Sequence, residues 1–406
     1  MDLGVPDHTA LTDATPVALG VPVLLLLFGA TLVGVLLFHR RALEVALGGL
    51  GLIVWVSVGQ AHFSLSTHLA HEWVKLANLL GLMVGFAQLA EHFERSGVPD
   101  SLVHVLPKGA RGCFALLGLV WLLSGVVDNI AAAMIGATAA SRVFNGRLHL
   151  GYLAAIVACA NAGGAGSVIG DTTTTMIWLE GVSPLRILPA YTGAAVALVV
   201  CGAAASIQQD RHVVADFGRV ERHAIDRARI AIVFVALLTM VGVNILGSAV
   251  LGARAERLPL MAIALWTVIL FSGPLRAPRW NIIPPALKSG VFLVALVLAA
   301  SLMPLRGLPA PSAATTLGLG FVSAIFDNIP LTKVALRQGG YDWALLAYAV
   351  GVGGSMLWFG SSAGVAVSSA FPSSRSAWRW ARSGWHVPLA FLLGYLAQRA
   401  IHGWNP

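Results

Sequence analysis

The chain has 406 residues, of which 57% are hydrophobic and only 11% are charged, and its mean hydropathy is +0.80. Soluble domains carry roughly 25% charged residues, so this deficit excludes an ordinary soluble protein and indicates one embedded in lipid. A formal net charge of +8 would suggest nucleic acid as the partner of a soluble chain. Here the basic residues lie in short loops between apolar segments, a pattern that orients membrane helices, and we expect no nucleic-acid binding.

Ten apolar segments follow one another along the chain, each close to or above the ~20 residues that a membrane-spanning helix requires. They are residues 17–38, 42–59, 74–92, 150–180, 184–207, 228–251, 258–274, 285–303, 342–369 and 385–402. We interpret each of them as one crossing of the bilayer.

Two further apolar runs, residues 113–142 and 312–339, are interrupted near the middle by Asp128-Asn129 and Asp327-Asn328. A charged Asp at membrane depth costs about 2.5–3.5 kcal/mol on insertion scales, so two of them in matched settings require a reason. We interpret both runs as re-entrant hairpins that enter and leave the bilayer on one side, with the aspartates at the tips.

The basic residues support this layout. With the N-terminus outside, ten crossings and two hairpins that do not cross, 18 of the 26 Lys and Arg residues fall in inner loops, as the positive-inside rule requires. The sequence therefore predicts a multi-pass protein of the inner (cytoplasmic) cell membrane, with both termini outside.

The order of these elements is repeated along the chain. The predicted divisions are an outer tail at 1–16, a first repeat at 17–207, an inner linker at 208–227 and a second repeat at 228–402. In each repeat the hairpin is followed by a span that its sequence should break, at 150–180 and 342–369. Five crossings per repeat is an odd number, so the second repeat lies upside down relative to the first. The expected fold class is an all-α polytopic membrane protein with two inverted-topology repeats, ten spans, two re-entrant hairpins and two broken helices.

The two broken spans are rich in glycine and hydroxyl groups. The first contains Asn161-Ala-Gly-Gly and Gly170-Asp-Thr-Thr-Thr-Thr, and the second contains Gly353-Gly-Ser and Gly360-Ser-Ser. Unwound backbone at membrane depth is tolerated only where it is buried in protein or lines a cavity. Its carbonyls and neighbouring hydroxyls suit a hard cation, whereas helix amino ends in the same place suit an anion equally well.

The acids in these segments have two compatible interpretations. Asp128, Asp171 and Asp327 can each cap the helix that follows, but an intramembrane carboxylate is by default a functional-site candidate. We expect the ion or substrate to be bound by Asp128, Asn129, Asn161, Asp171, Thr172, Thr173, Asp327, Asn328, Ser361 and Ser362. No resident metal is expected beyond transported Na⁺.

Other charged residues lie close to this set in sequence. Lys333 and Arg337 follow Asp327 on the second limb of its hairpin; pairing with Asp327 is possible, and we expect them instead to extend to the membrane surface. His62, His68, His71 and Glu72 are expected in an outer loop, where metal binding would need a further ligand.

Several of these motifs carry a family resemblance. Asn161-Ala-Gly-Gly, Ile169-Gly-Asp-Thr-Thr-Thr-Thr-Met-Ile-Trp, Ser323-Ala-Ile-Phe-Asp-Asn-Ile-Pro and Phe359-Gly-Ser-Ser-Ala-Gly resemble NhaD-type sodium/proton antiporters. These belong to the ion transporter superfamily (ArsB/NhaD and citrate-transporter-like membrane proteins), which includes citrate/dicarboxylate and arsenite carriers. The resemblance implies paired hairpins that face paired broken helices in a moving transport domain, a scaffold formed by the other spans, and a homodimer. The carboxylate carriers usually have Ser-Asn-Thr at the tips, where this chain has Asp-Asn.

The function predicted from the sequence is secondary active transport, with Na⁺/H⁺ antiport favoured because carboxylates attract cations and exchange protons. The alternative is a carrier of a small anion, such as citrate, a dicarboxylate or an arsenite-like oxyanion, coupled to Na⁺ or H⁺. No nucleophile–base arrangement or nucleotide-binding signature is present, so we expect neither an enzyme nor ATP-driven transport. The expected partners are the lipid bilayer and the small ions or anion, with Na⁺ and H⁺ as transported ions and no cofactor.

Overall fold

The computed structural model describes residues 17–18, 21–38, 41–59, 63–98, 101, 107–213, 224–251, 258–305 and 308–406. The predicted tail 1–16, His62 and residues 214–223 of the predicted linker lie outside the described residues. The described part of the chain is helical except for loops and one antiparallel pair of two-residue strands, β1 (Val17–Ala18) and β2 (Val21–Pro22).

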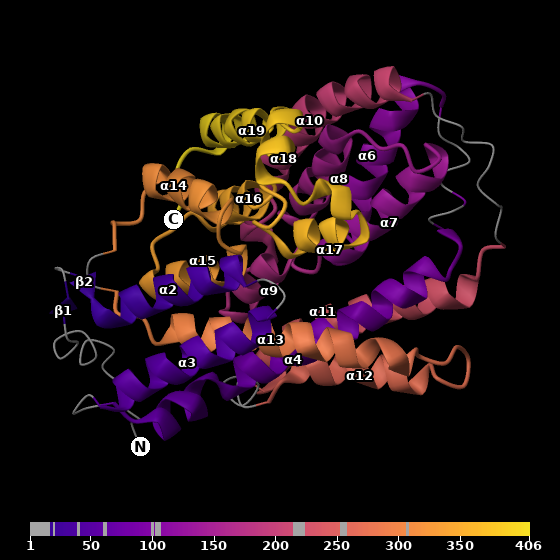
Figure 1. The fold of residues 1–406 in the computed structure, drawn as a ribbon. Helices are drawn as coiled ribbons and strands as arrows, with labels where there is room; N and C mark the ends of the chain where they lie inside the picture. The colour runs from indigo at the N-terminus through magenta and orange to yellow at the C-terminus, as the bar shows by residue number, and fades with distance from the viewer. Residues whose placement is uncertain are drawn as a thin grey trace.

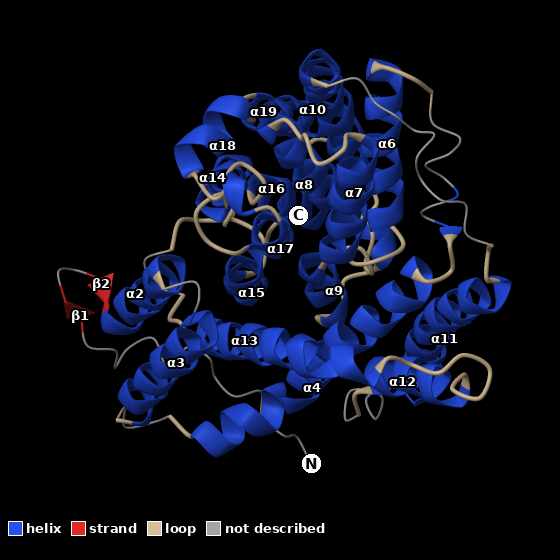
Figure 2. Cartoon of the chain, turned by 45° about the vertical axis from the view of Figure 1, so that its right-hand side comes forward, coloured by secondary structure: helices blue, strands red, loops and turns tan. Residues whose placement is uncertain are grey.

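The helices form two layers (Figures 1 and 2). One layer, which we call the scaffold layer, contains α2 (Val23–Leu37), α3 (Ala42–Val58), α4 (Leu65–Glu94), α11 (Arg227–Leu251), α12 (Leu260–Phe271) and α13 (Ile283–Ser301). Large apolar side chains such as Trp55 and Phe271 are exposed on it. Helices that are apolar nearly all round and expose such groups fit a lipid environment.

The other layer, which we call the core layer, contains both predicted hairpins and both predicted broken spans. Its helices are α6 (Ala110–Ser124), α7 (Asn129–Val143), α8 (Leu150–Gly164), α9 (Thr172–Leu179), α10 (Ala190–His212), α14 (Ala313–Ser323), α15 (Asn328–Gln338), α16 (Trp343–Gly353), α17 (Ser362–Ala370), α18 (Ala377–Ser383) and α19 (His386–His402). Short 3₁₀ helices lie at Pro184–Arg186, Trp280–Ile282 and Pro372–Ser374. Every residue of 151–164 in α8 and of 344–353 in α16 is buried, so these two helices form the centre of the core layer.

Helices end where glycine permits close backbone approach. A Cβ on Gly163 would lie 2.0 Å from the Trp121 carbonyl oxygen, and one on Gly353 would lie 2.1 Å from that of Gly320. The ends of α8 and α16 therefore contact the first limbs of the two hairpins, α6 and α14, at backbone distance. Beyond these glycines the chain is irregular at 165–171 and 354–361 before α9 and α17 begin. Pro330 lies in the first turn of α15, where a missing N–H leaves no intrahelical bond unmade.

Three described helices are long and apolar enough to cross a membrane by length and composition: Leu65–Glu94, Ala190–His212 and Trp280–Ser301. Shorter apolar helices of 10–17 residues make up much of the remainder, and the count of ten spans stays a prediction.

The predicted start of the third span was too late. Ser64 caps α4 by accepting the Thr67 N–H, so the helix begins before the apolar run. His68, His71 and Glu72 consequently lie on this helix and not in an outer loop, and Glu72 is buried.

Candidate functional site

Four helices, α7, α9, α15 and α17, begin at the irregular segments of the core layer, immediately after Asp128, Asp171, Asp327 and Ser361. The positive end of a helix dipole favours a carboxylate at this position. All ten predicted site residues fall on these helix starts or on α8, which packs against α7 and α17.

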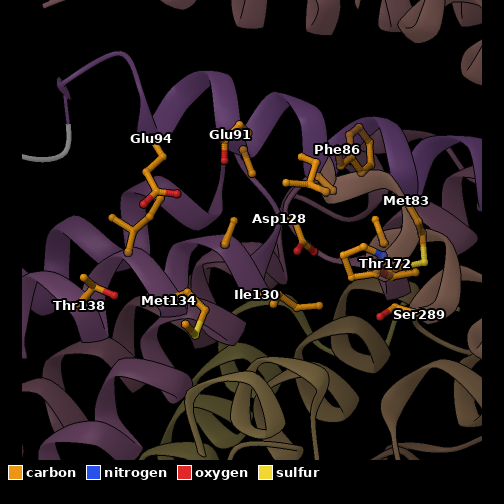
Figure 3. Close-up of a pocket in the computed structure, with 17 residues that line it drawn as sticks. Met83, Phe86, Glu91, Glu94, Asp128, Ile130, Met134, Thr138, Thr172 and Ser289 are labelled. Atoms are coloured by element: carbon orange, nitrogen blue, oxygen red, sulfur yellow. The ribbon is translucent and has the colours of Figure 1, made fainter. Parts of the chain in front are cut away.

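Asp128 precedes α7 and lines a cavity of about 440 Å³, together with Thr172 at the start of α9. Figure 3 shows Asp128 near the middle of the lining side chains, with Thr172 to one side of it and Glu91 and Glu94 of α4 to the other. The backbone N–H of Asn129 donates to the Gly170 carbonyl at 2.9 Å, which holds this hairpin tip against the broken segment of the same half. The cavity thus leads to a hairpin-tip carboxylate.

Asp171 lies between the two halves of the chain and is 2% exposed. Its Oδ1 accepts the backbone N–H of Thr173 at 3.0 Å, so it caps α9. The Asn328 side-chain amide of the second hairpin lies 3.4 and 3.5 Å from its two carboxylate oxygens. Asp128 and Asp327 are both close enough for their charges to act on this carboxyl group. Asp171 is therefore the acid on which the charges of both hairpin-tip acids act.

Asn161, fully buried on α8, connects residues of both halves. Its amide nitrogen donates to the hydroxyls of Ser355 at 2.9 Å and Ser361 at 3.0 Å. Its amide oxygen accepts from the side chain of Asn129 at 3.1 Å. This one side chain links the first hairpin tip to the second broken segment.

Asp327 is held at the start of α15. Its carboxylate accepts the Ile329 N–H and the Ser362 hydroxyl, each at 3.0 Å. Ser361 caps α17 by accepting the Gly364 N–H at 3.2 Å. The capping role considered for the aspartates is therefore present at Asp327, beside a direct contact with the second broken segment.

Sequence reasoning missed one residue of the hydrogen-bond network around Asn161 and two threonines that bond to the backbone of the first irregular segment. Ser355 contacts Asn161, and the only signal for it was a hydroxyl in a run of glycine and apolar residues. Thr174 donates to the Ser167 and Asp171 carbonyls at 2.5 and 2.7 Å. Thr175 donates to the Val168 carbonyl at 2.8 Å. The last two threonines of the run therefore hold the irregular backbone in place.

The expected surface position of Lys333 was wrong. Its side chain is 3% exposed and pairs with Glu72 at 2.9 Å and Glu180 at 2.7 Å. Glu72 was assigned to a loop, so the sequence offered no nearby acid other than Asp327. Arg337 is partly buried and donates to the carbonyls of Ala300 and Met303 at the end of α13.

Comparisons with known proteins show the family of the chain. A family described as "Citrate transporter" matches residues 9–353. The chain belongs to the citrate transporter family. It is 27% identical over 390 residues to "Sodium/proton antiporter 1" of Arabidopsis thaliana, covering 84% of this chain and 66% of that protein, so it spans about two-thirds of that relative's length.

Two further relatives of this citrate transporter family member cover more of both chains. "Sodium/proton antiporter 2" of Arabidopsis thaliana is 27% identical over 93% of this chain and 99% of its own length. "Na(+)/H(+) antiporter NhaD" of Alkalimonas amylolytica is 25% identical over 90% and 86%. The resemblance to NhaD-type antiporters within this family is confirmed, and the chain is a membrane transporter.

Proposed function

We propose that this protein is a Na⁺/H⁺ antiporter in which Na⁺ and protons compete for Asp128, Asp171 and Asp327. The observation that carries the proposal is the meeting of these acids with side-chain amide and hydroxyl groups of both halves at four helix starts. Three curated relatives are named for the same exchange.

The chemistry follows from the ligand types. Na⁺ is a hard cation that prefers carboxylate, carbonyl and hydroxyl oxygens, and all of these line the irregular segments. A carboxylate neutralised by Na⁺ or by a proton is cheaper to keep in a low-dielectric site than a bare one. Either ion therefore satisfies the same acids, which is the condition for exchange.

The proposed site residues comprise the three acids, the amides of Asn129, Asn161 and Asn328, and the hydroxyls of Thr172, Thr173, Ser361 and Ser362. A small-anion carrier is not favoured, because carboxylates at both hairpin tips repel an anionic substrate, although the family is described by citrate transport.

The proposed architecture places this site at the interface of two inverted repeats, 17–207 and 228–402, joined by the linker 208–227. It comprises ten spans, re-entrant hairpins at 113–142 and 312–339, and broken spans at 150–180 and 342–369. The supporting features are the two helix–Asp-Asn–helix units, the two glycine-rich breaks and the concentration of basic residues in the predicted inner loops. We further propose an inner-membrane location with both termini outside, and a homodimer.

The test is ion exchange by purified protein in liposomes that carry a pH gradient. Addition of Na⁺ or Li⁺ should dissipate the gradient, and Asp128→Asn and Asp327→Asn should abolish this effect. Asp342→Asn is the matched control, because Asp342 caps α16 outside the site and Asn caps nearly as well. Full exchange by both tip variants would remove the acids from the mechanism. Uptake of labelled citrate or succinate without Na⁺/H⁺ exchange would instead establish the anion carrier.

A further inference from the structure

Four charged side chains form a cluster near the beginning of α4, while the cavity that reaches Asp128 lies along its later part. We call this the gate cluster: Glu72 and Lys75 of α4, Glu180 at the end of α9, and Lys333 of α15. Lys333 Nζ donates to Glu72 Oε2 at 2.9 Å and to Glu180 Oε1 at 2.7 Å, and Lys75 Nζ donates to Glu180 Oε2 at 2.5 Å. The four formal charges cancel.

The gate cluster joins the two layers of the fold. Glu72 and Lys75 belong to the scaffold layer. In the core layer, Glu180 directly follows α9 and Lys333 lies on α15, the two helices that begin immediately after Asp171 and Asp327. Four residues beyond Lys333, Arg337 donates to carbonyls at the end of α13 in the scaffold layer. On this side, the half-helices that start at the ion site are held to the scaffold.

The corresponding face of the first hairpin is open. Lys333 and Arg337 are five and nine residues after Asn328; the residues five and nine after Asn129 are Met134 and Thr138. These two uncharged side chains line the cavity between α7, α4 and α13 (Figure 3). The face of the second hairpin is therefore closed by ion pairs, whereas the matched face of the first hairpin lines a cavity.

We propose that the gate cluster is a gate of the transporter. Its ion pairs close the approach to Asp171 and Asp327 from one side of the membrane, while the cavity admits ions to Asp128 from the other side. The pairs must separate when the site turns to face the closed side. This inference rests on the proposed exchange function and deepens it, because it assigns Lys333 as a positioning residue that favours the closed state.

The energetics favour a switch over a merely structural pair. Lys333 and Glu72 have side chains only 3% and 9% exposed, so removing one partner leaves a buried charge uncompensated. If the two layers part and water enters, each charge regains solvation without its partner. The cluster therefore stabilises two states, closed and hydrated, and disfavours a partly open one in which unpaired charges stay dry.

A reversible cross-link tests whether the gate cluster must open. Glu72→Cys/Lys333→Cys is prepared in a chain whose native cysteines, all free and buried, are replaced by alanine. This variant keeps the Lys75–Glu180 pair and loses one charge of each sign. A short reducible bis-thiosulfonate reagent should lower Na⁺/H⁺ exchange in liposomes by about tenfold or more, and a reductant should restore it. The control Trp73→Cys/Ala77→Cys carries both thiols on α4 and keeps all four charges of the gate cluster, and its cross-link should leave exchange intact. Unchanged exchange by the cross-linked gate variant would overturn the proposal.

Labelling provides a second readout that does not depend on transport. Leu79 lies beside the gate cluster and is 2% exposed. A membrane-impermeant maleimide should label Leu79→Cys slowly from both sides. With Glu72→Gln/Lys333→Gln the rate from one side should rise by about tenfold. Reversing all four charges together, in Glu72→Lys/Lys75→Glu/Glu180→Lys/Lys333→Glu, should return the rate toward the starting value. Equal rates in all three backgrounds would refute the gate. If these labelling differences were observed but the protein exchanged no Na⁺ for H⁺, the proposed function would be refuted and the gate would stand.

Discussion

Gly163 offers the sharpest test of how the hairpins are held against the broken helices. In Gly163→Ala the new Cβ would lie 2.0 Å from the carbonyl oxygen, 2.7 Å from the carbonyl carbon and 2.9 Å from the Cα of Trp121. Ordinary carbon contacts begin at roughly 3.5 Å, so α6 must move away by more than an ångström. The obstruction is backbone at all three atoms, and no side-chain rotation relieves it.

The expected cost is at the upper end of the range for overpacking, about 2–3 kcal/mol in the free energy of unfolding. Thermal unfolding in detergent or lipid should give a clearly lower Tm, and Na⁺/H⁺ exchange should fall because Trp121 lies seven residues before Asp128. Gly118→Ala is the matched control on α6, the helix that Gly163 contacts: nothing lies within 4 Å of its new Cβ, and alanine favours a helix over glycine by about 1 kcal/mol. If Gly163→Ala unfolded at the wild-type temperature, the close α6–α8 contact would be wrong.

Three other outcomes follow from the same structure. Gly353→Ala should destabilise as Gly163→Ala does, since its Cβ would lie 2.1 Å from the Gly320 carbonyl oxygen; equal Tm values for this variant and wild type would contradict the contact. Asn161→Ala removes three buried hydrogen bonds, each about 0.5–1.5 kcal/mol, and should abolish the dissipation of a pH gradient by added Na⁺ in liposomes. Lys75→Met should lower stability by about 1 kcal/mol or less in chemical unfolding, because its side chain is 33% exposed and solvent screens the pair; a much larger loss would show that Lys75 is as critical as Lys333.

The elements that sequence reasoning located are those whose signals are local. An Asp-Asn pair inside an apolar run and a glycine pair before a run of threonines are each a few residues long, and helices begin at Asn129, Thr172 and Asn328. The family resemblance rested on these same motifs and is confirmed. The site residues and the inverted repeat that we inferred from them remain proposals.

The elements that sequence reasoning misplaced depend on distant partners. Lys333 is 261 residues from Glu72, and no pattern around either residue reports the other. Because Glu72 was assigned to a loop, the lowest free energy for Lys333 was expected with its charged end extended to the membrane surface. Its burial became favourable only because α4 begins at Leu65 and brings an acid to the facing helix.

The two-fold resemblance between the hairpins makes their differences informative. Under the proposed inverted repeat, equal halves would provide equal paths from both sides, and the backbone alone would not decide which path is closed. The distinction lies in a few side chains: Lys333 and Arg337 bind the scaffold where Met134 and Thr138 leave a cavity. Replacing Lys333 together with its partner Glu72 by neutral residues should therefore shift the population of the two states while leaving each intact. A ligand or substitution shifts such an equilibrium only by the difference between its interaction free energies with the two states. The Lys333–Glu72 pair is therefore the place to measure the free-energy difference between the closed and open states.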